Sequence, residues 1–257
     1  MSVRIDPLLP WVGGKRLLSK QIVPMISSTD HTCYVEPCVG MGGVFFRRPT
    51  RAKSEVINDI NEDVITMFRT AQEHPDELRR HVSRLLHSRA EFQRFLRVPA
   101  DTLTDIQRAA RFILLQAVSF GGKVVSRNFG YDTAGRGRLH AGRLIERLSL
   151  LHRRLNGVII ERLDLFDCLA RYDRPSTLFY IDPPYIGTEH YYGKTWSRPD
   201  FIRLAEVLQG LRGRFILSIN DCTEARNLFG RWKMLQASLN WSVGGQPTAA
   251  KEIIITN

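Results

Sequence analysis

The sequence lacks the features that mark membrane-spanning, secreted or zinc-binding proteins. Its 257 residues contain no apolar run long enough to span a bilayer, and no basic and then apolar leader at the amino terminus. The four cysteines are scattered, with no Cys-x-x-Cys pair and no histidine at finger spacing. We therefore expect a soluble, unsecreted chain in the cytoplasm, with reduced thiols, no bound metal and no membrane partner.

Lysine is also scarce. Only seven of the 37 basic residues are lysine and 30 are arginine, whose planar guanidinium suits phosphates and guanine edges. Because the acidic residues number 26, the formal net charge is +11 and the pI is about 9.9. With 43% hydrophobic and 25% charged residues, the chain is globular. This composition favours a polyanionic partner, and nucleic acid is the leading candidate.

One short stretch combines a buried strand with reactive chemistry. Residues 177–181 predict a strand, because a brief β-branched and aromatic run ended by proline is too short for a helix. Asp182 follows at the carboxyl end of that strand, where open α/β sheets bind ligands. Pro183 and Pro184 remove two amide donors and stiffen the loop, and Tyr185 adds an aromatic face. This set suits a flat ring with an exocyclic amine, although an ordinary loop start is the alternative.

Two earlier segments indicate a nucleotide-binding half-unit. Residues 33–37 predict a strand, followed by a turn with Gly40 and Gly42 and an apolar helix start, without the third glycine of the dinucleotide fingerprint. Residues 55–59 predict a second strand ending in Asp59, a position suited to both hydroxyls of a ribose. The alternative for Asp59 is a helix N-cap, for which Asn61 competes.

Near the amino terminus, Gly13 and Gly14 precede a helix predicted over residues 16–26. We expect Lys15 in its first turn, where a cation is unfavourable against the helix dipole. Such a lysine indicates an anionic ligand group, such as a carboxylate or phosphate, or else a solvated loop position.

The middle of the chain has a helical and basic pattern instead of alternating strands and helices. Amphipathic helices with arginine-rich outer faces are predicted over residues 76–87, 89–97 and 104–120. A glycine-punctuated basic stretch follows, and from Phe120 to Arg154 eight basic residues oppose two acids. Such a segment is typical of a loop that enters a duplex groove, and a solvated flexible loop is the alternative. The basic side chains that we expect to contact DNA are Lys123, Arg127, Arg136 and Arg138.

After this segment the α/β pattern returns. Strands are predicted over residues 157–161 and 214–219, and helices over 199–211 and 224–229, with Asp164 opening another short helix. An antiparallel pair is predicted over 234–241 and 252–256, joined by a loop over 242–251 that could contact phosphates. Residues 186–198 predict a polar and aromatic lid.

Five ordered motifs together resemble one family, the Dam-type DNA adenine-N6 methyltransferases, over nearly the whole chain. They are Trp11-Val12-Gly13-Gly14-Lys15, Glu36-Pro37-Cys38-Val39-Gly40-Met41-Gly42, Asn58-Asp59-Ile60-Asn61, Asp182-Pro183-Pro184-Tyr185 and Lys251-Glu252-Ile253-Ile254-Ile255-Thr256-Asn257. The resemblance implies an α/β fold, a Rossmann-like class I methyltransferase sheet with a mostly helical, basic target-recognition insert. It implies a catalytic domain over residues 1–71 and 155–257 and the DNA-recognition insert over 72–154.

The resemblance also implies the reaction, which is methyl transfer from S-adenosylmethionine to N6 of adenine in a flipped-out base of double-stranded DNA. The catalytic group would be Asp182, Pro183, Pro184 and Tyr185. The cofactor would be bound by Trp11, Lys15, Glu36, Gly40, Gly42, Asp59, Asp164, Phe166 and Asp182. No obligate protein partner is implied, and the enzyme would act on the nucleoid of a bacterial or phage-infected cell, in restriction-modification or another form of DNA modification.

The insert departs from the family pattern. Many relatives that methylate GATC carry an asparagine and an arginine in the hairpin that corresponds to Phe120–Arg127. Here Arg127 can stand for the arginine and the asparagine is missing, so the resemblance assigns no recognition sequence.

Other functions stay open on the residues alone. The same fold could act on N4 of cytosine or on RNA, since the Asp-Pro-Pro-Tyr group suits any amine on a planar amide-like ring. A nicotinamide-dependent oxidoreductase and a non-catalytic DNA-binding derivative are the remaining alternatives.

Overall fold

A seven-stranded mixed sheet forms the centre of the protein. The structure, a computed structural model, describes residues 4–131, 137, 139–188, 196–243 and 246–257. The strand order is β3-β2-β1-β4-β5-β7-β6, with β1 to β5 parallel and β7 antiparallel to both β5 and β6. The strands are β1 (Cys33–Glu36), β2 (Ser54–Asn58), β3 (Ile159–Glu161), β4 (Thr177–Ile181), β5 (Arg214–Asn220), β6 (Lys233–Val243) and β7 (Gln246–Thr256). The order reverses between β1 and β4, which is the Rossmann-like switch point, so the predicted fold class is confirmed.

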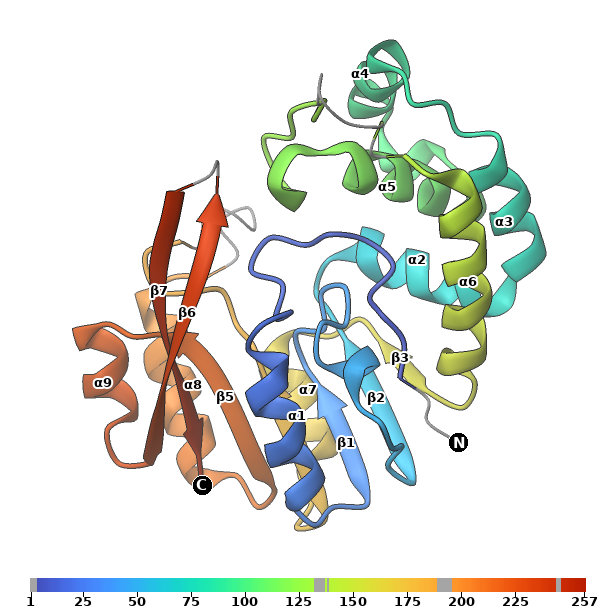
Figure 1. Cartoon of the computed structure of the whole chain (residues 1–257). Helices are drawn as coiled ribbons and strands as arrows, with labels where there is room; N and C mark the ends of the chain where they lie inside the picture. The colour runs from blue at the N-terminus through green and yellow to red at the C-terminus, as the bar shows by residue number, and fades with distance from the viewer. Residues whose placement is uncertain (1–3, 132–136, 138, 189–195, 244–245) are drawn as a thin grey trace.

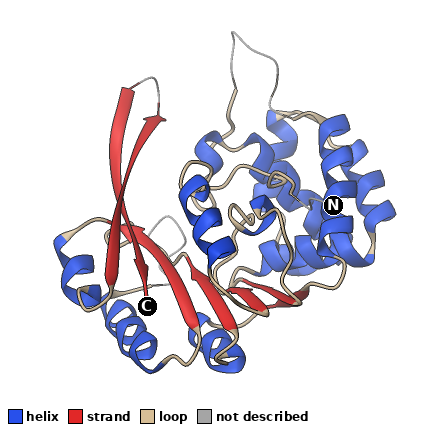
Figure 2. Ribbon diagram, turned by 60° about the horizontal axis from the view of Figure 1, so that its bottom comes forward, coloured by secondary structure: helices blue, strands red, loops and turns tan. Residues whose placement is uncertain are grey.

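Helices cover both faces of the sheet (Figure 2). Alternate residues of each strand point to opposite faces: Phe179 and Ile181 contribute to one core cluster, and Leu178 and Tyr180 to the other. The first cluster is completed by α7 (Leu165–Tyr172), α8 (Arg198–Gly210) and α9 (Thr223–Phe229). The second is completed by α1 (Ser19–Ser28), α2 (Glu62–Glu73), α3 (Pro75–Ser83), α4 (Arg89–Arg97), α5 (Asp105–Val118) and α6 (Ala141–Leu155).

The helical segment stands above one end of the sheet (Figure 1). In it α5 packs against α2, α3 and α4, and α6 packs against α2 and α3. Short 3₁₀ turns lie at η1 (Phe45–Arg47), η2 (Ala100–Thr102) and η3 (Phe120–Gly122). The amino-terminal segment, dark blue in Figure 1, runs between these helices and the sheet. Residues far apart in sequence therefore meet at this junction.

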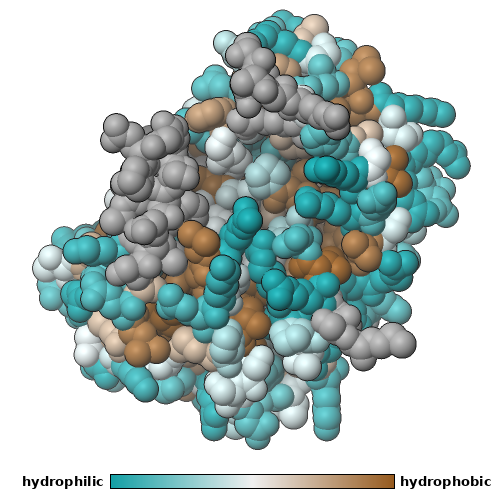
Figure 3. Space-filling view, in the orientation of Figure 1, coloured by the Kyte–Doolittle hydropathy of each residue, from teal (hydrophilic) through white to brown (hydrophobic). Residues whose placement is uncertain are grey.

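Hydrophilic side chains cover much of the outer side of the helical segment in the face that Figure 3 shows. This agrees with the predicted arginine-rich outer faces. Among the described residues no helix has the length and apolarity needed to cross a membrane.

Most predicted elements are found within a few residues of their expected bounds, but two expectations are wrong. The loop predicted over residues 242–251 is largely strand, because β6 runs to Val243 and β7 starts at Gln246. The two strands pair from Lys233 opposite Thr256 to Val243 opposite Gln246, so cross-strand pairing extends both beyond the apolar alternation. Lys15 lies before α1 instead of in its first turn, since the helix starts at Ser19.

Candidate active site

A large pocket opens at the carboxyl ends of β1, β2 and β4. Its volume is about 1190 Å³. It brings together most of the predicted site residues, which lie in five separate stretches of the chain. Those that line it are Trp11, Lys15, Glu36, Gly40, Asp59, Asp164, Asp182 and Pro184. The other predicted site residues are not part of the lining but are within two positions of it in the sequence; they are Gly42, Phe166, Pro183 and Tyr185.

Asp182 is held at the pocket wall by two polar side chains. Its Oδ2 lies 2.9 Å from the Lys15 Nζ, and its Oδ1 accepts a 2.9 Å hydrogen bond from the Ser218 hydroxyl. The Asp182 side chain is 19% exposed and that of Lys15 only 5%. Burial raises the pKa of Asp182 to about 6, although Lys15 opposes this shift. At neutral pH the carboxylate is therefore mostly ionised.

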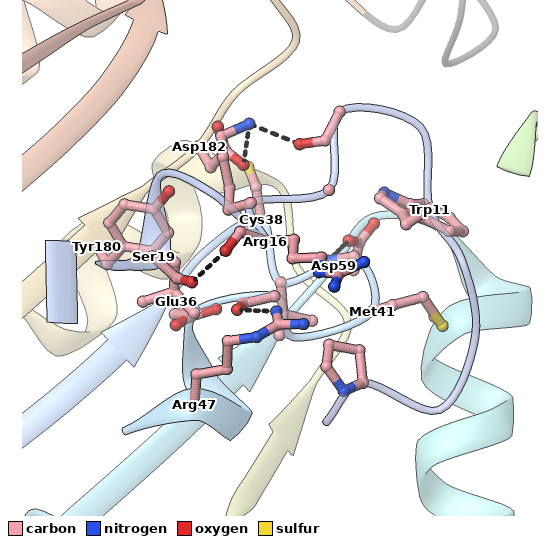
Figure 4. A pocket seen from close by; sticks show the side chains of 18 of the residues that line it. Trp11, Arg16, Ser19, Glu36, Cys38, Met41, Arg47, Asp59, Tyr180 and Asp182 are labelled. Carbon is pink, nitrogen blue, oxygen red and sulfur yellow. Dashed lines mark hydrogen bonds and ion pairs between the residues drawn. The ribbon is translucent and has the colours of Figure 1, made fainter. Parts of the chain in front are cut away.

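Lys15 also contacts the aromatic member of the Asp-Pro-Pro-Tyr stretch. Its Nζ lies 4.6 Å from the Tyr185 ring centroid and donates a 2.7 Å hydrogen bond to the Gly13 carbonyl. The ammonium thus bridges the Gly13 turn, the carboxylate and one ring face. Figure 4 shows Asp182 in this pocket together with Glu36, Asp59 and Trp11. Because the rings of Pro183 and Pro184 restrict φ, the loop that carries this aromatic ring is stiff.

Asp59 closes the pocket on the side of β2. Its Oδ2 accepts a 2.8 Å hydrogen bond from the Gly40 amide, and its Oδ1 a 2.9 Å bond from the Asn61 amide. Burial raises the pKa of Asp59 to about 6 in spite of these bonds. Asn61, not Asp59, caps α2, because its side chain accepts from the amides of Asp63 and Val64. Asp59 is therefore not needed as the helix cap, and each of its oxygens keeps a further lone pair with which to accept a ligand hydrogen bond.

The glycine turn allows very close packing against Trp11. Gly40 has a φ of +49°, and a Cβ atom there would lie 2.6 Å from the Trp11 Nε1. Gly42 has a φ of +69°, and its Cβ would lie 2.3 Å from the Phe46 ring. Both positions require glycine, since left-handed backbone and the lack of space exclude a side chain. The turn can therefore bring main-chain atoms close to a ligand.

Glu36 lies at the bottom of the pocket, at the end of β1. Its side chain is 2% exposed and its Oε1 accepts a 2.7 Å hydrogen bond from the Tyr34 hydroxyl. Burial raises the pKa of Glu36 to about 8. A cationic group bound beside it would favour the ionised form.

Asp164 and Phe166 start α7 at the edge of the pocket. The Asp164 carboxylate caps this helix by accepting a 2.8 Å hydrogen bond from the Phe166 amide. The Phe166 ring is 7% exposed and stacks on Trp196, which also lines the pocket, with the centroids 6.0 Å apart. Trp196, at the end of the predicted lid, is the described part of that lid that reaches the pocket, and residues 189–195 lie outside the described residues.

Two of the four expected DNA-contacting residues, Lys123 and Arg127, lie in the described part of the helical segment. Lys123 is half-buried after η3. The Arg127 guanidinium turns inward and donates to the Gln116 Oε1 at 3.2 Å and to the Lys123 carbonyl at 3.2 Å. Burial lowers the pKa of Arg127 to about 10, so it remains charged at neutral pH. Arg136 and Arg138 lie outside the described residues.

Two buried residues of the site were missed by the sequence reasoning. Ser218, fully buried in β5, binds Asp182 and also exchanges a 2.8 Å hydrogen bond with the Tyr180 hydroxyl. Glu252, 3% exposed in β7, accepts a hydrogen bond from the Tyr185 hydroxyl. A polar residue beside a run of apolar strand residues is the one signal that could have indicated either of them.

The arrangement of these groups agrees with a comparison against known families. The profile of the D12 class N6 adenine-specific DNA methyltransferases matches residues 11–240. The chain belongs to this family. The protein is thus an S-adenosylmethionine-dependent enzyme that methylates adenine in DNA, and the predicted family, enzyme class and cofactor are confirmed.

Curated relatives of this methyltransferase point in the same direction. The type II methyltransferase M1.LlaDCHI of Lactococcus lactis subsp. cremoris is 26% identical over 282 aligned residues, which cover 100% of this chain and 96% of the relative. The type II methyltransferase M.MjaIII of Methanocaldococcus jannaschii is 26% identical over 205 residues, 71% of this chain and 70% of the relative. Among solved structures, a precorrin 8W decarboxylase of Methanobacterium thermoautotrophicum shares 10% identity with a TM-score of 0.43, over 99% of this chain and 97% of that one.

Proposed function

We propose that methyl transfer takes place at the carboxyl end of β4, with Asp182 and the Pro183 carbonyl as acceptors for the two N6–H groups of an adenine flipped out of duplex DNA. The observation that carries this proposal is the place of Asp182. It is a largely buried carboxylate on the wall of a pocket that also contains Asp59, Glu36 and the glycine turn.

The residues of the pocket suit S-adenosylmethionine. Glu36 and Asp182 are buried acids that favour a cationic ligand, and Asp59 lines the pocket with carboxylate oxygens that would accept from the two hydroxyls of a ribose. The Gly40 turn, packed under Trp11, provides close main-chain approach. The remaining contacts would come from Lys15, Gly42, Asp164 and Phe166. When bound, the cofactor supplies an electrophilic methyl group.

Asp182 would make the amine a better nucleophile. The N6 lone pair of adenine is delocalised into the ring, so the nitrogen must become pyramidal before it attacks. Two hydrogen bonds, to the Asp182 carboxylate and the Pro183 carbonyl, favour that geometry, and the carboxylate stabilises the positive charge that develops on N6. Lys15 and Ser218 hold the carboxylate in place and ionised.

Tyr185 would stack on the flipped adenine. Its ring is oriented by the hydrogen bond from its hydroxyl to Glu252. The Lys15 ammonium now faces this ring. A base that stacks there would share the site with Lys15, and the lysine would shift toward the Gly13 carbonyl that it already contacts.

Extruding the base costs a few kcal/mol, which contacts to the DNA backbone can offset. We assign these contacts to residues 72–154 as a target-recognition insert, and the chemistry to residues 1–71 and 155–257. Lys123 would contact phosphate, while Arg127, which donates to the main chain of its own loop, would keep that loop in shape. Arg136 and Arg138 would extend the basic surface. The enzyme would act on the nucleoid of a bacterial or phage-infected cell.

The test is transfer of labelled methyl from S-adenosylmethionine to unmethylated duplex DNA, with the product nucleosides identified by mass spectrometry. The wild type is expected to give N6-methyladenine. Asp182→Ala is expected to lower the rate by at least about 10²-fold, the scale measured for the loss of one charge-stabilising group, with little change in DNA affinity. Asp167→Ala, an exposed aspartate of α7, is the control. An Asp182→Ala enzyme with wild-type activity would refute the assignment.

A further inference from the structure

The segment from Pro10 to Gly13 lies between the cofactor pocket and the recognition loop, which we define as residues 119–130. On the pocket side, the Trp11 indole packs on Gly40 so closely that a Cβ there would lie 2.6 Å from the Trp11 Nε1. On the other side, a Cβ at Gly122 would lie 3.0 Å from the Trp11 main-chain nitrogen. The same tryptophan thus contacts the glycine turn with its side chain and the recognition loop with its main chain.

One glutamine joins the two segments. Gln116, in α5, is completely buried, and its Nε2 donates a 2.8 Å hydrogen bond to the Pro10 carbonyl and a 2.7 Å bond to the Gly122 carbonyl. Its Oε1 accepts a 3.2 Å bond from Arg127. Both N–H donors and the carbonyl oxygen of this amide are therefore used, one donor for the amino-terminal segment and the other two groups for the recognition loop.

The recognition loop is itself closed by main-chain hydrogen bonds. The Phe120 amide donates to the Asn128 carbonyl at 2.9 Å, and the Gly130 amide to the Val118 carbonyl at 2.7 Å. The Val12 amide donates to the Gly122 carbonyl at 3.1 Å, which ties the loop directly to the amino-terminal segment. A displacement of Trp11 would therefore be carried to Gly122 and to the rest of this closed loop.

We propose that Gln116 is a positioning residue that couples occupancy of the cofactor pocket to the shape of the DNA-recognition loop. The inference rests on the proposed function, since it takes Trp11 as part of the cofactor site and residues 119–130 as DNA-contacting. Its physical basis is that breaking either donor bond leaves a polar group unpaired in a dry interior, which is costly. The Pro10–Gly13 segment and the recognition loop therefore move as one unit, and a ligand that fixes one fixes the other.

Coupling of this kind is measured as a ratio of affinities. The dissociation constant of a DNA duplex is determined with and without saturating S-adenosylhomocysteine for the wild type, Gln116→Met and Gln72→Met. Methionine keeps the length of the side chain and removes its hydrogen bonds. Gln72 is the matched control, because it is a half-buried glutamine of α2 in the same helical segment whose Nε2 donates to the Leu155 carbonyl, away from the pocket.

We expect S-adenosylhomocysteine to tighten DNA binding by about tenfold in the wild type and in Gln72→Met, within the usual range for coupled sites, and by less than about twofold in Gln116→Met. Gln116→Met that keeps the tenfold factor overturns the proposal. Failure of the wild type to bind S-adenosylhomocysteine or DNA would instead refute the proposed function.

A second measurement does not depend on how far Gln116→Met is destabilised. Amide hydrogen exchange over residues 119–130 is followed with and without S-adenosylhomocysteine in the wild type and in Gln116→Glu, which keeps the acceptor for Arg127 and loses both amide donors. The ligand is expected to slow exchange in the wild-type loop and to leave the variant loop unchanged. Equal protection in both proteins counts against the proposal.

Discussion

Asp182 lies between groups with opposite effects on its charge. Burial raises its pKa to about 6, with Glu252 acting in the same direction, while Lys15 and the Ser218 hydroxyl lower it. The main interaction that keeps the carboxylate ionised is thus the one with Lys15. The same lysine contacts the Tyr185 ring, so a change at Lys15 should affect both the charge of Asp182 and stacking of the substrate base on Tyr185.

The pH dependence of methyl transfer should report this balance. The pKa of Asp182 is raised in the folded enzyme, so the carboxylate is protonated and loses acceptor capacity as the pH falls through about 6. We expect kcat/KM to fall about tenfold per pH unit below that value. Lys15→Met removes an opposite charge, so the pH below which kcat/KM falls should rise by about one pH unit.

Rates measured from pH 5 to 8 with duplex DNA provide the check, with Lys53→Met, an exposed lysine that is not part of the pocket lining, as the control. If kcat/KM falls at the same acidic pH in Lys15→Met and in the wild type, then Lys15 does not set the charge of Asp182.

At the scale of elements, the connection from β1 to η1 depends on glycine. Gly42 has left-handed backbone and its missing Cβ leaves room for the buried Phe46 ring. The Phe46 ring in turn packs on Phe45 and Phe68, which belongs to α2. The shape of the cofactor turn is thus fixed by the hydrophobic core below it.

Gly42→Ala should therefore reduce both stability and cofactor binding. A left-handed alanine costs about 1–3 kcal/mol, and the contact with Phe46 adds to this. Gly142→Ala is the matched control: it lies in the first turn of α6, and a Cβ there meets no atom within 4 Å. Because alanine favours helix, we expect this control to be neutral or stabilising by up to about 1 kcal/mol.

Denaturant unfolding and calorimetric titration with S-adenosylhomocysteine measure the two effects. If Gly42→Ala unfolds and binds like Gly142→Ala, then the turn does not need its left-handed glycine.

At the scale of the whole molecule, positive charge is concentrated away from the sheet. The net charge is +11, and the basic residues of the recognition loop and α6 lie in the helical segment above the pocket. The chemistry and the charge therefore come from different layers of the fold. The amino-terminal segment lies between these layers, and α2, which packs on α5, α6 and β3, also connects them.

DNA affinity should accordingly depend strongly on salt. Each phosphate neutralised adds about −0.9 to the slope of log K against log salt concentration. Lys123→Ala should make that slope shallower by about one unit. Lys233→Ala should leave it unchanged, because Lys233 starts β6 opposite Thr256, at the end of the sheet away from the pocket.

The dissociation constant of a DNA duplex is measured for both variants by fluorescence anisotropy at salt concentrations from about 50 to about 200 mM, where such slopes are large. Equal slopes for Lys123→Ala and the wild type would remove Lys123 from the phosphate contacts.

Local pattern was sufficient for much of the fold and the site. The strand over residues 177–181 is found at its predicted bounds, because a short β-branched and aromatic run and the prolines that follow it are local signals. Asp59, Asp182 and the glycine turn could be singled out because ends of parallel strands meet at one edge of a sheet. The hairpin of β6 and β7 was underestimated, since cross-strand pairing extends strands beyond the apolar run.

By itself the sequence therefore determined where most strands lie along the chain, the chemical groups at their ends and the basic character of the helical segment. Only the tertiary structure decided which polar groups meet. Ser218 binds Asp182, Glu252 accepts from Tyr185, and the Gln116 amide donates to the Pro10 and Gly122 carbonyls. The physical reason is that a buried hydrogen bond selects partners by proximity in space. Periodicity along the chain carries no information about such pairs until the sheet and the helical segment have packed together.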